Sequence, residues 1–251
     1  MKLRNLKIVE SKEELSRIPD GKTLINTINA HSYNVAQKDK LFEEALTNGD
    51  YLIPDGFSIV KACRLRKGLS RPKERIAGWD LFVIEMKKLD DAAAKVDADK
   101  TVQKERKKKV MFMGSSEKVL TLIRERCKTD YPSLEVVTYS PPYKPEFSEE
   151  DNKAIINAIN TANPDLLWVG ITAPKQEKWT YQHWDELQIH CHTGTIGAVF
   201  DFFAGTVKRA PEWWQSHSLE WLYRLLKEPR RMWRRYILGN FKFLWNIITI
   251  G

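Results

Sequence analysis

The chain has 251 residues, of which 42% are hydrophobic and 29% charged, so it can bury a full core and is not expected to be disordered. Its net charge is +8. Three widely spaced cysteines without a CxxC pair argue against a disulfide framework or a cysteine zinc site, and predict a cytoplasmic protein. Charges scattered through the first ten residues exclude a secretory signal, and no apolar run approaches the roughly 20 residues of a membrane span. Any membrane contact is therefore expected to be peripheral.

Periodicity in the first part of the chain predicts alternating strands and helices. We expect strands over 22–29 and 51–54, and helices over 32–47, 57–66 and 79–89. A polar, highly charged run over about 90–109 has no apolar face and is interpreted as a solvated linker or a helix extension.

The second part alternates more regularly. Predicted strands cover 110–113, 134–139, 166–170 and 189–202, with helices to about 129, over 148–161 and after Ala173-Pro174. This order predicts an α/β domain with a Rossmann-like parallel sheet and helices on both faces. Because such sheets bind ligands at the carboxyl ends of their strands, the loops after Met113, Tyr139, Gly170 and Phe200 form the expected rim of a site.

We expect an α/β core over 1–205, with an N-terminal part to about 90 and a nucleotide-binding part over about 110–205, and an appendage over 206–251. The appendage holds nine lysines and arginines, three carboxylates and five of the nine tryptophans. At 100° per residue, Arg224, Arg231 and Arg235 share one helical arc, and Trp and Leu side chains lie opposite. Pro229 is expected to start a second helix or to kink the first. The pattern indicates a helix on an anionic membrane surface; the alternative is a helix packed on its own domain with solvated arginines.

Three polar residues are candidates for chemistry at the predicted strand ends of the first part. Asp55 follows strand 51–54 and can face a cleft as a carboxylate, although an Asp before a helix is also a common N-cap. Thr27 and Asn29 alternate along the preceding strand and therefore share one of its faces.

The second part offers two further turns. The Gly114-Ser115-Ser116 turn can present backbone N–H groups to a phosphate, or can be an ordinary Ser-capped turn. Gln176 lies in the first turn of a helix, where a capping role is also common. There is no GxGxxG fingerprint for a nicotinamide or flavin cofactor, and His190 and His192 lack a third ligand, so we expect no cofactor and no metal.

Five motifs give the chain a resemblance to a known family. LINTINAHS, PDG, ERIAGWDLF, PDLLWVGITAPKQEKW and AVFDFFAGTVKRAPEWWQSHSLEWLYRLLKEPRRMWRR occur in this order. In order and spacing the chain resembles the WecG/TagA/CpsF glycosyltransferases. The resemblance implies an inverting, metal-independent transfer of N-acetylmannosamine or a related hexose from a UDP-sugar to a polyprenyl-diphosphate-linked sugar. It also implies peripheral attachment to the inner face of a bacterial membrane, in polysaccharide or teichoic acid synthesis, and leaves a homo-oligomer open.

The resemblance also implies roles for individual residues. Asp55 matches the general base, with Thr27 and Asn29 beside it, and Gln176 completes the group. Further matches are the pocket residue Arg75, the nucleotide contact Asp201 and the appendage arginines Arg224, Arg231 and Arg234. Gly114 and Ser115 are expected at the nucleotide from the turn that they form. The chain departs from the family pattern at the Gly114-Ser115-Ser116 turn, which puts the details of phosphate binding in doubt.

Two other functions fit parts of the sequence. The main alternative is a basic lipid- or nucleic-acid-binding module with a nucleotide-sensing α/β domain. Nucleic acid is the weaker partner, because the positive charge is backed by Trp and Leu and no nucleic-acid motif is present. A dinucleotide-dependent oxidoreductase lacks its fingerprint.

Overall fold

The computed structural model describes residues 1–98, 106–216, 219–233 and 237–249. Six parallel strands form one sheet in the order β2-β1-β6-β5-β3-β4. Their bounds are β1 Thr23–Ile28, β2 Tyr51–Pro54, β3 Lys109–Gly114, β4 Glu135–Tyr139, β5 Leu166–Gly170 and β6 His192–Thr195. Since β1 pairs with β6, strands from both parts of the predicted core share this sheet.

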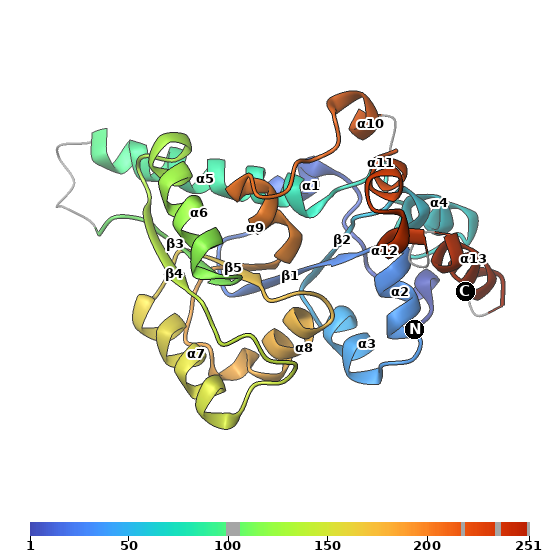
Figure 1. Cartoon of the computed structure of the whole chain (residues 1–251), viewed down its shortest axis with the longest axis horizontal. Helices are drawn as coiled ribbons and strands as arrows, with labels where there is room; N and C mark the ends of the chain where they lie inside the picture. Colours follow the sequence, from blue (N-terminus) through green and yellow to red (C-terminus); the bar gives the residue numbers. More distant parts are fainter. Residues whose placement is uncertain (99–105, 217–218, 234–236, 250–251) are drawn as a thin grey trace.

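Helices cover both faces of the sheet, as Figure 1 shows for α5, α6 and α9 on one side and α3, α7 and α8 on the other. Their bounds are α1 Lys12–Ser16, α2 Ala30–Ala36, α3 Lys40–Thr47, α4 Phe57–Leu65, α5 Gly78–Ala98, α6 Glu117–Asp130, α7 Glu149–Ala162, α8 Lys175–Gln182 and α9 Gly197–Ala204. The predicted α/β architecture with a parallel sheet is therefore confirmed.

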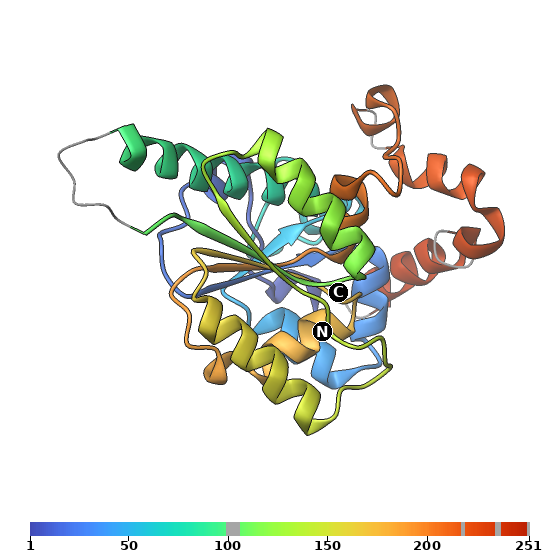
Figure 2. The ribbon, with the colours of Figure 1, turned by 60° about the vertical axis from the view of Figure 1, so that its left-hand side comes forward.

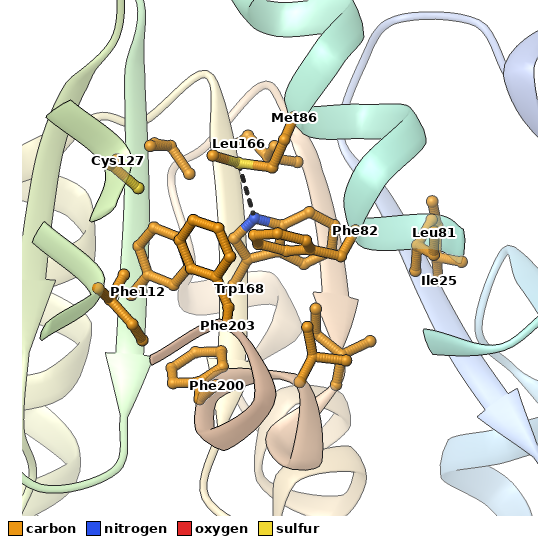
Figure 3. Packing of buried hydrophobic residues seen from close by; sticks show 14 of the residues in the cluster. Ile25, Leu81, Phe82, Met86, Phe112, Cys127, Leu166, Trp168, Phe200 and Phe203 are labelled. Carbon is orange, nitrogen blue, oxygen red and sulfur yellow. Dashed lines mark hydrogen bonds between the residues drawn. The ribbon is translucent and has the colours of Figure 1, made fainter. Parts of the chain in front are cut away.

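The central strands are buried on both faces, which explains their continuous apolar sequences. In β3, Val110 and Phe112 join one core cluster, whereas Met111 and Met113 join the cluster on the opposite face. Aromatic rings fill the first cluster, where Phe82 lies 4.8 Å from Phe203 between ring centroids. Figure 3 shows these rings around Trp168, whose indole N–H donates to the Met86 sulfur at 3.4 Å.

Three predicted elements differ from the structure. The helix expected over 32–47 is two helices, because Asp39 starts α3 by accepting the Phe42 N–H. Helix α5 runs to Ala98, so the helix expected over 79–89 is longer than predicted, and the first half of the charged run is the helix extension that was one of its two interpretations. The strand expected over 189–202 ends at Thr195, and helix α9 begins at Gly197, so Phe200 lies within a helix rather than at a strand end.

The appendage is helical: α10 Glu212–Ser216, α11 Glu220–Lys227, α12 Pro229–Trp233 and α13 Gly239–Thr249. Pro229 starts a helix, as one of the two interpretations expected. Figure 2 shows part of the appendage projecting away from the sheet and its covering helices. Helix α13 returns to the core, where Phe243 packs edge-on against Tyr33 of α2 at 5.3 Å and the Asn246 amide donates to the Asn34 side chain at 3.0 Å.

Candidate active site at the carboxyl edge of the sheet

The Asp55-Gly56 turn follows β2 and is hydrogen-bonded to the end of β1. The Asp55 backbone N–H lies 2.9 Å from the Ile28 carbonyl oxygen and 3.0 Å from that of Ile53. A Cβ on Gly56 would lie 3.4 Å from the Asn29 Cβ, so this turn rests directly against Asn29. The N-cap of α4 is Gly56 rather than Asp55. The half-buried Asp55 therefore lies at the carboxyl edge, one residue before the cap.

Thr27 and Asn29 lie beside this turn but use their side chains differently. Thr27 is half-buried and is paired with Ile53 of β2. The Asn29 Oδ1 accepts the N–H groups of His31 and Ser32, each at 3.0 Å, and thereby caps α2. This capping role was not predicted, and it fixes the orientation of the Asn29 amide.

The Gly114-Ser115 turn is tightly coupled to the end of β5. A Cβ on Gly114, whose φ is +125°, would lie 2.3 Å from the Gly170 carbonyl oxygen. The Ser115 N–H donates to that same carbonyl at 3.0 Å, and Ser116 provides the N-cap of α6. The Ser115 N–H is thus committed to the sheet edge, so other N–H groups of this turn have to provide any phosphate contact.

Gln176 connects the starts of α8 and α9. Its Oε1 accepts the Gly197 N–H at 3.2 Å, and its Nε2 donates to Glu177 Oε1 at 3.0 Å. Both side chains are buried. Burial raises the pKa of Glu177 to about 7, and the hydrogen bond from Gln176 offsets only part of that effect. Sequence reasoning missed Glu177, although it is the next residue of the same APKQE motif.

Arg75 reaches the same edge from the segment before α5. The Ile76 N–H donates to the Pro54 carbonyl at 3.1 Å, which places Arg75 near the Asp55 turn. The Arg75 guanidinium pairs with Glu220 of α11 at 3.4 Å, and Arg209 reaches the same carboxylate oxygen at 3.9 Å. Neither Arg209 nor Glu220 was among the predicted site residues.

Asp201 lies on α9 and not at the end of a strand, which corrects the expected setting of this residue. Its Oδ1 accepts the Thr206 hydroxyl at 3.1 Å, and its carbonyl accepts the Val207 N–H at 3.2 Å. Asp201 therefore stabilises the turn that leads from the core into the appendage.

The predicted appendage arginines are only partly described. Arg224 lies on α11 and Arg231 on α12, but their side chains, and the whole of Arg234, lie outside what the structure describes. Four apolar side chains of α13 point away from the core: Phe241, Leu244, Trp245 and Ile248, which are 55–70% exposed. Among the described residues, no helix combines the length and apolarity that a bilayer crossing requires.

His192 has a structural role at the opposite edge of the sheet. Its Nδ1 lies 2.9 Å from Glu85, and its Nε2 lies 2.9 Å from the Pro19 carbonyl. Within the described ranges, no three His, Cys, Asp or Glu side chains are grouped as metal ligands. A surface cavity of about 410 Å³ at the start of β2 is lined by Lys7, Glu13, Arg17 and Tyr51 among others, and none of the predicted site residues lines it.

Comparison with known proteins identifies the family. The model of the glycosyl transferase WecG/TagA/CpsF family matches residues 1–250. The N-acetylglucosaminyldiphosphoundecaprenol N-acetyl-beta-D-mannosaminyltransferase of Bacillus spizizenii is 32% identical over 203 residues, which is 80% of this chain and 70% of that protein. The Bacillus subtilis protein of the same name is 31% identical over 214 residues, or 85% of this chain and 75% of the relative. The chain therefore belongs to the WecG/TagA/CpsF family and is a glycosyltransferase.

Proposed function

We propose that this glycosyltransferase transfers N-acetylmannosamine, or a closely related hexose, from a UDP-sugar to N-acetylglucosamine carried on a polyprenyl diphosphate. The name that both relatives share supports the transferred sugar and the acceptor. The observation that carries the proposal is the convergence of Asp55, Asn29 and Arg75 at one end of the sheet. Parallel sheets bind their ligands at this end.

In this mechanism Asp55 is the general base. As the acceptor oxygen bonds to the anomeric carbon, its proton passes to the Asp55 carboxylate. General base catalysis of this kind accelerates a reaction by a factor of about 10² to 10⁴. The bond between the anomeric carbon and the diphosphate oxygen breaks, and UDP leaves with the electron pair. A single displacement of this kind inverts the anomeric configuration. To Thr27 and the Asn29 amide N–H groups we assign the orientation of the sugar beside the base.

The departing diphosphate gains negative charge, which needs fixed positive groups. We assign this role to Arg75 and to the appendage residues Arg224, Arg231 and Arg234, because guanidinium pairs with phosphate through two parallel hydrogen bonds. Gly114, Ser115 and Asp201 are assigned to the nucleotide side, and Gln176 to the sugar side. With these cations in place, the transfer is expected to need no divalent metal.

The appendage is proposed to hold the enzyme on the inner face of the membrane. Phe241, Leu244, Trp245 and Ile248 give α13 an exposed apolar face, and cations such as the exposed Arg230 suit anionic headgroups. A lipid surface removes these side chains from water. A second copy of the chain is the other occupant to test, by measuring the mass of the protein in solution with and without detergent.

The test is a donor screen with the purified full chain and a polyprenyl-diphosphate-linked N-acetylglucosamine acceptor. UDP-N-acetylmannosamine is expected to give a disaccharide-lipid product in the presence of EDTA, whereas UDP-glucose and UDP-galactose give little. If none of the three donors gave product, or if chelation abolished the product, the proposal would be contradicted. Selective binding of nucleic acid without transfer would favour the binding-module alternative.

A further inference from the structure

One cation of the core and one from the start of the appendage meet a carboxylate of α11. Arg75 precedes α5 and Arg209 follows α9, and both approach the same oxygen, Glu220 Oε2. All three side chains are largely shielded, with exposed fractions of 20%, 20% and 13%. Two guanidinium groups around one carboxylate leave a net positive charge at a partly desolvated site, where electrostatic interactions are stronger than in water.

Contacts with core residues position both of these cations, and none of these contacts involves the appendage helices. The hydrogen bond from Ile76 N–H to Pro54 positions Arg75 beside the Asp55 turn. The Arg209 guanidinium lies over the Trp79 ring at 4.8 Å, and Trp79 is only four residues from Arg75. Arg209 is therefore held against the short segment over 75–79 that carries Arg75.

The geometry suits an anion larger than a carboxylate. A diphosphate offers oxygens on two phosphorus atoms and more negative charge than Glu220, and each guanidinium can pair with one phosphate through two hydrogen bonds. Both of these ion pairs are long and use the same Glu220 oxygen, Oε2, at 3.4 Å from Arg75 and 3.9 Å from Arg209. Glu220 is therefore a poorer partner for this pair of cations than a diphosphate.

We propose that Arg75 and Arg209 form the diphosphate subsite of the donor, and that Glu220 is an internal anion which occupies this subsite until the donor displaces it. The inference rests on the proposed function only in naming the donor as the source of the diphosphate. It adds Arg209 as a binding residue and Glu220 as a competitor. Because Glu220 is the first residue of α11, its release frees the start of that helix from the core.

The consequence is a reduced apparent affinity of the subsite for the donor diphosphate. A ligand that must displace an internal competitor binds more weakly, in proportion to the fraction of molecules in which the subsite is open. Neutralising the competitor should therefore strengthen anion binding, whereas neutralising Arg209 should weaken it. If the ion pairs of Glu220 had a purely structural role, neutralising Glu220 would weaken anion binding, because the site would become less ordered.

The experiment titrates inorganic pyrophosphate, and separately UDP, into the full chain and its Glu220→Gln and Arg209→Gln variants by calorimetry. Glu220→Gln should tighten pyrophosphate binding by about three- to tenfold. Arg209→Gln should weaken it by about tenfold or more. Glu212→Gln, which removes the same charge from an exposed position on α10, is the matched control and should change little.

Unchanged or weaker pyrophosphate binding by Glu220→Gln, in a variant that melts at the wild-type temperature, overturns the proposal. If that variant melts lower, Glu220→Ser provides a second neutral test under the same criterion. Because the readout is pyrophosphate binding, it does not depend on sugar transfer. Tighter pyrophosphate binding by Glu220→Gln, together with no transferase activity in the wild-type chain, would reject the proposed function and keep the subsite.

Discussion

The sheet core and the appendage use apolar side chains in opposite ways. In the core, Phe82, Phe112 and Trp168 are at most 1% exposed and pack against one another. In the appendage, α13 buries Phe243 and Ile247 against the core but leaves Trp245 67% and Ile248 70% exposed. The core is therefore stabilised by its own packing, whereas the outer face of α13 gains stability only from an external surface.

The largest expected effect is on catalysis and leaves the packing of both regions unchanged. Asp55→Asn keeps the shape of the side chain but removes the proposed base, so kcat should fall by about 10² to 10⁴ with little change in melting temperature. Asp185→Asn, at an exposed position, is the matched control and should retain the wild-type rate. A full rate in Asp55→Asn would falsify the assignment of the base.

The packing contrast predicts the next largest effect. Phe82→Ala should lower the free energy of unfolding by about 3–5 kcal/mol, because it opens a cavity among aromatic rings that cannot close around it. Trp245→Ala should change it by less than about 0.5 kcal/mol, because the indole is mostly exposed. Urea titration of both variants measures the difference, and equal losses would contradict the distinction between the two regions.

Glu177 provides a pH-dependent test within the core. Its pKa is raised by burial from 4.5 to about 7, so between these values the carboxyl ionises in the unfolded chain while it stays protonated in the folded one. Stability therefore decreases as the pH rises through this window. Glu177→Gln should remove that decrease. The difference in unfolding free energy between the variant and wild type should therefore shift in favour of the variant by about 1–3 kcal/mol from pH 5 to pH 8.

The control for this measurement is Glu125→Gln, whose side chain is 63% exposed and pairs with Lys128. That variant should follow the wild-type pH profile closely, because an exposed ion pair contributes little. A wild-type profile in Glu177→Gln would show that burial of this carboxyl does not control the pH dependence.

The smallest expected effect concerns the outer face of α13. Trp245→Ser with Ile248→Ser should lower partitioning into anionic vesicles by about tenfold, while the melting temperature stays within about one degree. Leu65→Ser is the control, since Leu65 is 79% exposed but lies on α4 of the core. Equal losses of vesicle binding in both proteins would remove the special role of α13.

The fold was largely predictable because its strands and helices differ in period and are bounded by turn residues. The missed boundaries have local causes. Asp39 is an N-cap that divides the expected helix over 32–47, and a cap within a continuous amphipathic pattern is easily overlooked. The run after Thr195 is apolar whether it forms strand or helix, and only Gly205, whose φ is +75°, marks a helix end.

The candidate site was less predictable than the fold. The positions of Asp55, Thr27 and Asn29 in the sequence predicted that they lie at neighbouring strand ends, and in the structure they lie close together. The capping role of Asn29 depends on the turn that follows it, and the contact between Arg75 and Glu220 joins residues 145 positions apart. Such long-range ion pairs leave no periodic signal, so Arg209 and Glu220 became visible only in three dimensions.

The central claim is that core and appendage share one active site, and transfer to a soluble acceptor without membranes tests it most directly. The full chain carrying Arg224→Gln, Arg231→Gln and Arg234→Gln is compared with wild type and with the Trp245→Ser and Ile248→Ser protein. The account predicts that the arginine variant loses at least about tenfold in kcat, whereas the α13 variant retains the wild-type rate. Wild-type turnover by the arginine variant would contradict the claim and limit the appendage to membrane attachment.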